Sequence, residues 1–411
     1  MSQTNKLKIF NDPIYGFITI PNSLIYDLIQ HPYFQRLRRI SQMGMSYLVY
    51  PGAHHTRFHH ALGCMHIMQK AVQTLPSKGV AISEEEENAL YIAILLHDIG
   101  HGPYSHAMEH SIVEEVHHEE LSLLFMEQLN KEFDGKLALA IQVFKGEYHR
   151  KFMLQLISSQ LDMDRMDYLK RDSFYSGVAE GNINSERLIQ MMNVQDDYLV
   201  IEEKGIYSVE KFLVARRLMY WQAYLHKTSV VAELILTKIL KRAKELTQKG
   251  IVLPCSESLQ FFMQNKISLS DFDKSVLDKF SYLDDYDVMG AIKSWQFHHD
   301  FVLQSLCRMI LNRDLLKIQM TDDKPNKENL LGIKNKYIAL AGISDKEADY
   351  FVFKGKLKNQ AYSKSSEPIR ILKKDKTIED VVEASDQLHL KALSKPVTKY
   401  FICFPKVVLE A

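Results

Sequence analysis

The sequence predicts a mainly α-helical protein with short β-hairpins and a smaller C-terminal α+β lobe. From Ser23 onward, apolar residues such as Leu24 and Leu28 recur at helix spacing. Near 315–345 the composition becomes polar, and three segments of alternating apolar residues follow, YFVFKGKL, EPIRIL and KYFICFP. We therefore expect an N-terminal arm over 1–22, a helical core over 23–290 and a C-terminal lobe over 291–411, helical at first and α+β from 320.

The individual elements follow from local signals. Within the arm, DPIYGFITIP alternates as a short hairpin does. In SEEEENALYIAILLHD, Ser83 and Glu86 form a capping box and acidic residues fill the first helical turn. Apolar spacing predicts further helices over 119–132, 136–144, 151–172, 184–193 and 208–247, and DDYLVIEEKGIYS (196–208) is typical of a hairpin.

Composition places the chain among globular proteins without a strong charge. It has 411 residues, 46% of them hydrophobic, and 51 basic residues match 51 acidic ones, so no net basic field points to nucleic acid as the main partner. No apolar stretch could span a bilayer, and the N-terminus lacks a signal core. The scattered cysteines favour a reducing compartment and argue against a thiolate zinc site. We expect a cytoplasmic protein with no membrane partner; nucleic acid is not indicated.

The chemistry is concentrated in AILLHDIGHGPYSHAMEH, residues 93–110, where a helix ends on adjacent histidine and aspartate. At the last turn before Gly100, His97 and Asp98 can converge on one cation. Two further ligands lie in helical contexts, His60 in RFHHALG and Asp164 in LDMDRMDYLKRD. Two imidazoles and two carboxylates suit one divalent Mn, Fe, Ni, Co, Zn or Mg ion and leave coordination positions open.

Each of these pieces alone has a simpler interpretation. An isolated His-Asp pair is usually structural, and DMDRMD alone would be a solvated helix face. His54, His55 and His59 fit loop or supporting positions. The combination is far more specific than its parts.

The order His60, His97–Asp98 and Asp164 resembles the HD superfamily of metal phosphohydrolases. The strings around it narrow the resemblance to the deoxynucleoside triphosphate triphosphohydrolases of that superfamily, which include bacterial enzymes and the animal enzyme that couples a SAM to an HD domain. Those strings are NDPIYGFITIP, FQRLRRISQMG, YPGAHHTRFHHALG, LLHDIGHGPYSH, HHEE, LDMDRMDYLKRDSFYSG and AYLHKT. They cover about residues 8 to 245, and the resemblance implies an all-helical HD-domain core.

The resemblance also implies roles for individual residues. His60, His97, Asp98 and Asp164 would be the metal ligands. His118 would donate a proton to the leaving group and Glu119 would position it, while His101 and His106 would flank the α-phosphate. The residues implied in substrate binding are Arg57 and Arg216 at the phosphates, Arg165 and Arg171 as positive charge beside Asp164, Gln42, Met43, Tyr168 and Asp172 at the sugar, and Tyr224 along the base. Positions 216, 220, 224 and 227 share one face of the expected long helix, so Lys227 could line the same cleft.

The implied reaction is metal-dependent hydrolysis of deoxynucleoside triphosphates, dGTP among them, to deoxynucleoside and inorganic triphosphate, with no organic cofactor. Two alternatives remain open at this point. One is an HD phosphatase or phosphodiesterase for a monophosphate, cyclic or alarmone nucleotide, and the other is a nucleotide-binding sensor with a weak site.

The resemblance further implies a homo-oligomer, a dimer or tetramer, with a nucleotide activator at subunit contacts. Guanine-activated relatives carry an acidic residue in the segment matching LIQHP, where this chain has Gln30, although Arg38 is retained. We expect subunit contacts on the arm 1–22 and the C-terminal lobe.

Overall fold

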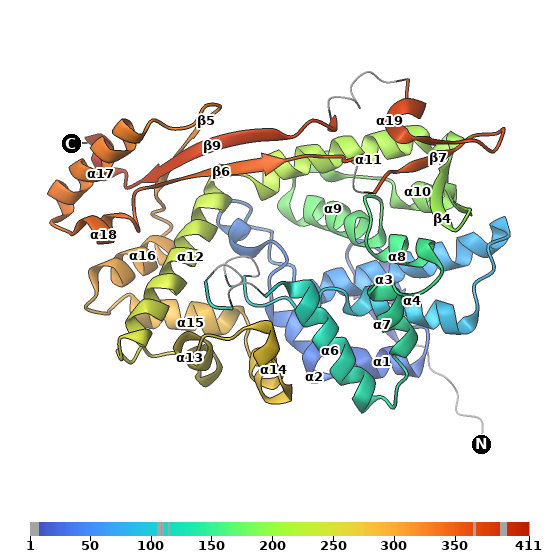
Figure 1. The fold of residues 1–411 in the computed structure, drawn as a ribbon, viewed down its shortest axis with the longest axis horizontal. Coiled ribbons are helices and arrows are strands. Elements are labelled where there is room, and N and C mark those ends of the chain that lie inside the picture. The colour runs from blue at the N-terminus through green and yellow to red at the C-terminus, as the bar shows by residue number, and fades with distance from the viewer. Residues whose placement is uncertain are drawn as a thin grey trace.

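A helical body with strands along one edge forms the molecule (Figure 1). The computed structural model describes residues 8–104, 108, 111–113, 116–364, 367–386 and 393–410. The expected class, mainly α with short hairpins and a small C-terminal α+β part, is confirmed. No helix within these described ranges has the length and apolar character needed to cross a membrane.

The main helices of the body, among the described residues up to 248, follow in chain order. They are α1 (Ser23–Gln30), α2 (Pro32–Gln35), η2 (Gly44–Leu48), α3 (Arg57–Thr74), α4 (Glu84–Leu96), α6 (His118–Glu132), α7 (Ala138–Phe144), α8 (Lys151–Ile157), α9 (Met163–Ser176), α10 (Ser185–Met191), α11 (Ile206–Met219) and α12 (Lys227–Gln248). Helix α3 packs against both α4 and α9. The residues expected to bind metal lie on α3 and α9 and directly after the end of α4.

Helix α4 begins where its capping signals predict. The Ser83 side chain accepts a hydrogen bond from Glu86 N, and Glu86 accepts one from Ser83 N. The expected N-terminal hairpin is also present, as β1 (Ile9–Asp12) paired with β2 (Gly16–Thr19). Asp12 shapes its turn by accepting hydrogen bonds from Ile14 N and Tyr15 N.

Two expected helices are broken. The helix expected over 151–172 is two helices, α8 and α9, because Asp162 caps α9 by accepting from Arg165 N at 2.7 Å. The helix expected over 208–247 leaves α-helical geometry in a π-turn at Tyr220–Tyr224 and restarts after His226, which caps α12. The interruption separates Lys227 from the face of Arg216, Tyr220 and Tyr224, so our expectation that Lys227 lines the same cleft is wrong. Lys227 lines a different cavity.

The second hairpin exists but lies earlier in the chain than expected. Strands β3 (Met192–Gln195) and β4 (Tyr198–Glu202) are joined by Asp196 and Asp197, both with positive φ, as a two-residue hairpin turn requires. The residues from 206 onward, which we expected in the hairpin, begin α11 because the strand pattern ends at Glu202.

The C-terminal part contains four more helices before its strands, α13 (Glu257–Gln264), α14 (Lys274–Ser281), α15 (Asp285–Trp295) and α16 (Phe301–Leu311). Strand β9 (Val397–Phe404) lies between β5 (Lys317–Thr321) and β6 (Phe353–Asn359) in an antiparallel sheet. The C-terminal part also contains the 15-residue helix α17 (Lys327–Ala341) and the short helices α18 (Asp345–Ala348), α19 (Val381–Ala384) and α21 (Val407–Glu410).

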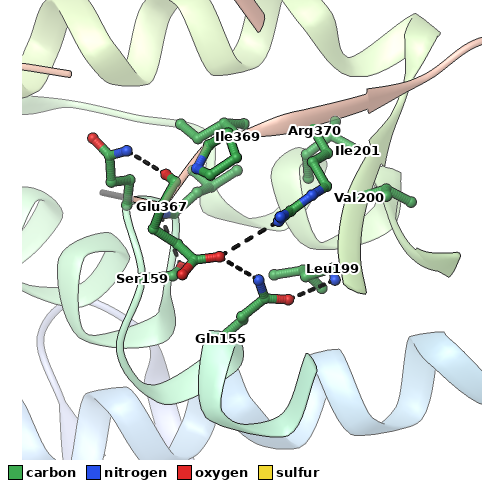
Figure 2. A pocket seen from close by; sticks show the side chains of 11 residues that line it. Gln155, Ser159, Leu199, Val200, Ile201, Glu367, Ile369 and Arg370 are labelled. Carbon is green, nitrogen blue, oxygen red and sulfur yellow. Dashed lines mark hydrogen bonds and ion pairs between the residues drawn. The ribbon is translucent and has the colours of Figure 1, made fainter. Parts of the chain in front are cut away.

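One sheet joins the C-terminal part to the helical body. Strand β7 (Arg370–Leu372) pairs in parallel with β4 and antiparallel with β8 (Ile378–Asp380). Figure 2 shows the junction, where Gln155 bonds both Glu367 and the backbone N of Leu199 around a cavity of about 20 Å³. That volume suits one water molecule, so the junction is closely packed.

Candidate metal centre and nucleotide pocket

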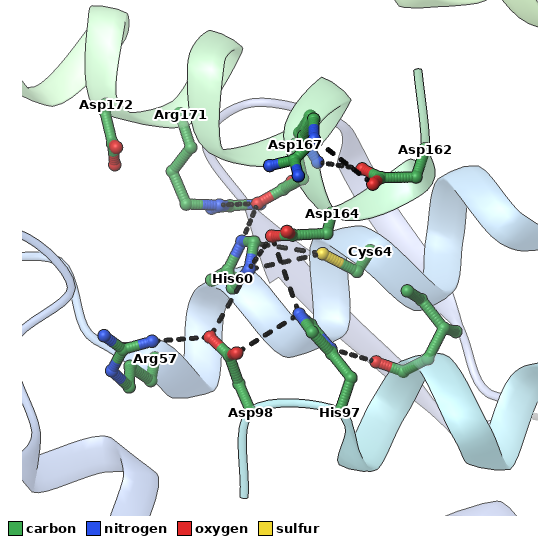
Figure 3. Close-up of polar contacts among 12 residues, drawn as sticks. Arg57, His60, Cys64, His97, Asp98, Asp162, Asp164, Asp167, Arg171 and Asp172 are labelled. Carbon is green, nitrogen blue, oxygen red and sulfur yellow. Dashed lines mark hydrogen bonds and ion pairs between the residues drawn. The ribbon is translucent and has the colours of Figure 1, made fainter. Parts of the chain in front are cut away.

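The four residues expected to bind metal converge in the structure (Figure 3). His60 Nε2 lies 3.1 Å from Asp164 Oδ1 and 3.7 Å from Asp98 Oδ2, and His97 Nε2 lies 3.4 Å from Asp98 Oδ1 and 3.6 Å from Asp164 Oδ1. His60 and Asp164 lie in the first turns of α3 and α9, and His97 and Asp98 directly follow α4. Three segments far apart in the sequence thus present imidazole nitrogens and carboxylate oxygens to one point.

The end of α4 orients His97. Its Nδ1 lies 2.7 Å from Ile94 O, and because a carbonyl only accepts, Nδ1 carries the proton and Nε2 keeps its lone pair. Ser122 of α6 accepts from Gly100 N and donates to His97 O. A Cβ at Gly100 would lie 2.2 Å from His118 O, so glycine is required for this close approach of α4 to α6.

His60 is held by a buried chain of charges. Its Nδ1 lies 2.8 Å from Asp167 Oδ2, and Arg171 donates to Asp167 from Nε and Nη2 and to Asp12 from Nη1. Arg171 therefore supports the cluster from behind. We had expected it to supply positive charge beside Asp164. A carboxylate on the far nitrogen of a ligating histidine fixes the ring and raises its basicity.

Cys64 lies against the cluster, which the scattered cysteines did not predict. Its Sγ is 3.5 Å from His60 Nδ1 and 3.6 Å from Nε2. Nearly equal distances to both nitrogens place the sulfur over the face of the ring, away from the direction of the Nε2 lone pair. Cys64 therefore packs against a ligand and does not complete the ligand set.

The expected acid–base residues lie beside the cluster. His101 Nε2 is 3.3 Å from Asp98 Oδ1, and the His101 and His118 rings stack with centroids 3.9 Å apart. Glu119 follows His118 in the first turn of α6 and is exposed. His106 lies outside the described residues.

A pocket of about 360 Å³ opens beside the metal cluster. Seven residues expected to bind substrate line it: Gln42, Met43, Arg57, Arg165, Tyr168, Asp172 and Tyr224. Arg57 also donates from Nη1 to Asp98 Oδ2 at 2.5 Å, so the pocket begins at the cluster. Such a volume is in the range of small-ligand sites.

The pocket walls are tied to one another. Asp172 accepts from Tyr224 OH at 2.8 Å and lies 2.6 Å from His55 Nε2, so His55 supports the pocket, as we expected. Arg165 donates from Nε to Ser159 O and lies 3.4 Å from Asp162. Arg216 does not line the cavity, but its charge acts on the phenol of Tyr168.

Comparisons with known proteins agree with this geometry. The model of the HD domain matches residues 57–172, and that of the HD associated region matches 183–252. A solved phosphohydrolase from Bacteroides thetaiotaomicron is 50% identical with a TM-score of 0.94, covering 97% of this chain and 100% of that one. The uncharacterized protein YwfO of Bacillus subtilis is 37% identical over 330 residues, 78% of this chain and 73% of that protein. This chain belongs to the HD-domain phosphohydrolase family.

The deoxynucleoside triphosphate triphosphohydrolase SAMHD1 homolog of Dictyostelium discoideum is 30% identical over 264 residues. The match covers 59% of this chain and 51% of that protein, so the HD-domain protein described here spans about half the length of this relative. The matched HD segment contains all four residues of the cluster and ends at Asp172 of the pocket.

The electrostatics of this HD-domain centre suit a cation. Burial alone would raise the pKa of Asp98 and Asp164, but neighbouring imidazoles, and Arg57 beside Asp98, hold both well below the usual range. Both carboxylates are therefore ionised. His97 Nε2 is buried and faces carboxylate oxygens at 3.4 and 3.6 Å, but among the described residues it has no partner in hydrogen-bonding geometry. An N₂O₂ donor set with such an orphaned nitrogen fits a divalent metal ion.

Sequence reasoning missed several residues of the site. Asp167 and Asp12, which hold Arg171, were not singled out, although Asp167 stands at helix spacing from both Asp164 and Arg171. Tyr104 and Glu233 also line the pocket. Tyr104 has a φ of +46°, a backbone conformation that nothing in its local sequence indicates.

Proposed function

We propose that this HD-domain protein hydrolyses deoxynucleoside triphosphates to deoxynucleoside and inorganic triphosphate. The observation that carries the proposal is the continuity of cluster and pocket through Arg57, which bonds Asp98 and lines the cavity. A phosphate at the cluster can thus belong to a nucleoside that fills the pocket. The match to a relative named as a triphosphohydrolase for these substrates supports the same reaction.

Different residues around the pocket would contact different parts of the substrate. Arg57 and Arg165 line the pocket and would bind the phosphate oxygens, and Arg216, whose charge reaches the phenol of Tyr168 from outside the lining, would add to the positive charge around the phosphates. The phenols of Tyr168 and Tyr224 would contact sugar and base. Tyr220 and Tyr224 pack edge to face, with ring centroids 5.2 Å apart. Three guanidiniums are suited to the charge that gathers on a departing triphosphate.

His60, His97, Asp98 and Asp164 would hold one divalent ion, which supplies Lewis-acid chemistry at the α-phosphate. In the overall step, a water oxygen bonds to the α-phosphorus and the bond from phosphorus to the 5′ oxygen breaks. His118 donates a proton to that oxygen, which is otherwise a poor leaving group, and His101 keeps the His118 ring in place by stacking. Glu119 would help to orient His118. No organic cofactor is needed.

We also propose that the protein acts as a homo-oligomer, a dimer or tetramer, in the cytoplasm. A nucleotide activator between subunits is a further prediction. Gln30, which replaces the acidic residue of guanine-activated relatives, argues against a guanine nucleotide in that role.

Incubation of metal-loaded protein with each deoxynucleoside triphosphate, singly and mixed, tests the proposed reaction. Chromatography should show deoxynucleoside and intact triphosphate. Release of orthophosphate from a different nucleotide would favour the phosphatase alternative, and nucleotide binding without turnover would favour a sensor.

The variant Asp98→Ala should abolish turnover and metal binding. Asp27→Ala, at an exposed position of α1, is the matched control and should keep both. Full activity in Asp98→Ala would exclude both enzyme hypotheses.

A further inference from the structure

Asp285 connects two walls of the pocket from a helix outside both matched family segments. Its Oδ2 accepts a hydrogen bond from Ser41 N at 2.8 Å, and its Oδ1 accepts one from Tyr104 N at 3.0 Å. The residue is 7% exposed. A single buried carboxylate thus joins two loops that are more than sixty positions apart in the chain.

Both bonded loops belong to the pocket. Ser41 directly precedes Gln42 and Met43, and Tyr104 lines the cavity with its own side chain. Gln42 N donates to His55 O and Arg57 N donates to Ile40 O, so the Ser41 loop is also paired with the segment that enters α3. A shift of Ser41 would therefore move the Gln42 and Met43 wall relative to Arg57.

Tyr104 needs an external support. Its φ of +46° is in the left-handed region, which residues with a Cβ rarely adopt and which persists where surroundings impose it. The hydrogen bond from its backbone N to Asp285 is one such constraint.

Asp285 is not needed to cap its own helix. Asp284 performs that task by accepting from Tyr286 N, and Asp284 also ion-pairs with Arg39, which anchors the start of α15 to the segment before Ser41. The second carboxylate of LDDYD is therefore directed at the pocket loops from a fixed base.

We propose that Asp285 is a positioning residue that sets the shape of the nucleotide pocket by tying the Ser41 loop to the Tyr104 loop. The expected effect on KM rests on the proposed function, whereas the expected loosening of the two loops rests on geometry alone. Among the described residues, the Asp285 carboxylate accepts its hydrogen bonds from Ser41 and Tyr104 and none from the metal cluster or from His118, so we expect its effect to fall on substrate binding.

The test compares Asp285→Ala, which removes both acceptors, with Asp285→Asn, which keeps one. The matched control is Asp287→Asn, on the same helix, where the side chain accepts from Asp284 N within that helix. In Asp285→Ala, amide hydrogen exchange at Ser41 and Tyr104 should accelerate roughly tenfold or more. KM for the best deoxynucleoside triphosphate should rise roughly tenfold, with kcat changed much less and metal content unchanged.

Asp285→Asn should show a smaller change confined mainly to one loop, and Asp287→Asn should match wild type. If Asp285→Ala does not fold, Asp285→Asn decides the question through the same measurements. Wild-type exchange at both amides together with wild-type KM would overturn the proposal, and so would loss of metal from the folded variant. If the wild-type protein hydrolyses no deoxynucleoside triphosphate, the proposed function fails, while the exchange comparison still decides the role of Asp285.

Discussion

Asp167→Asn tests the buried support behind the metal cluster. Asp167 is fully buried and accepts from Arg171 while its Oδ2 lies 2.8 Å from His60 Nδ1. The substitution keeps the size of the side chain but removes the charge that both neighbours face. Two losses should follow, one in folding stability and one in metal affinity.

The two losses have different sizes and causes. Removing one partner of a buried ion pair costs about 3–5 kcal/mol, and we expect the low end of that range because Arg171 keeps its bond to Asp12 at 2.7 Å. Loss of a carboxylate that orients a ligating histidine lowers metal affinity roughly 10- to 100-fold, or about 1.4–2.7 kcal/mol.

Denaturant unfolding of the metal-free protein measures the first loss, and competition with a chelator measures the second. Asp12→Asn is the matched control, because it removes the other carboxylate of Arg171 without touching His60. It should lose stability and keep metal affinity. If both variants weaken metal binding equally, general loosening explains the effect and the His60–Asp167 contact does not.

Two further predictions follow from buried polar groups. Arg216→Met should raise KM for nucleotides roughly tenfold or more, because the variant lacks a guanidinium proposed to act on the phosphates. The melting temperature should not fall, because Nε and Nη1 of Arg216 are buried with no hydrogen-bond partner among the described residues. An unchanged KM with a lower melting temperature would contradict this. Burial raises the pKa of Asp285 from 3.8 to about 6, so the native state binds the proton more tightly than the unfolded chain. As the pH rises from about 3.8 to about 6, the free energy of unfolding of wild type should therefore fall by about 3 kcal/mol relative to that of Asp285→Asn. If denaturant unfolding gives the same pH dependence for both proteins, the raised pKa of Asp285 is refuted.

Elements with local signals could be predicted from the sequence. The capping box at Ser83 and Glu86 marks the start of α4, and strand alternation marks the hairpin at residues 9–19. The interruption between α11 and α12 could not be predicted, because the apolar pattern continues through Tyr220–Tyr224 while the backbone departs into a π-turn. Periodicity reports which face is apolar and says little about where a helix restarts.

The same distinction applies to the site. His60, His97, Asp98 and Asp164 were found because each stands in a motif of characteristic sequence. Asp285 was not, because its function depends on contacts with Ser41 and Tyr104, which are brought to it only by the packing of α15. Residues that touch the metal have local signatures, whereas residues that shape the pocket depend on tertiary structure.

The buried charge of Arg36 stabilises the backbone next to the metal cluster. Arg36 is fully buried and donates to Ile99 O directly after the ligand pair. Its guanidinium carbon lies 5.2 Å from the ring centroids of both Phe125 and Phe280, and burial lowers its pKa to about 9. Apolar residues of similar volume often stabilise a fold more than buried ions do. Since the Arg36 guanidinium bonds the carbonyl next to Asp98, it holds the end of α4 where a hydrophobic side chain could only fill space. Burying the Arg36 charge costs stability, but its hydrogen bond to Ile99 O fixes the backbone segment that carries His97 and Asp98.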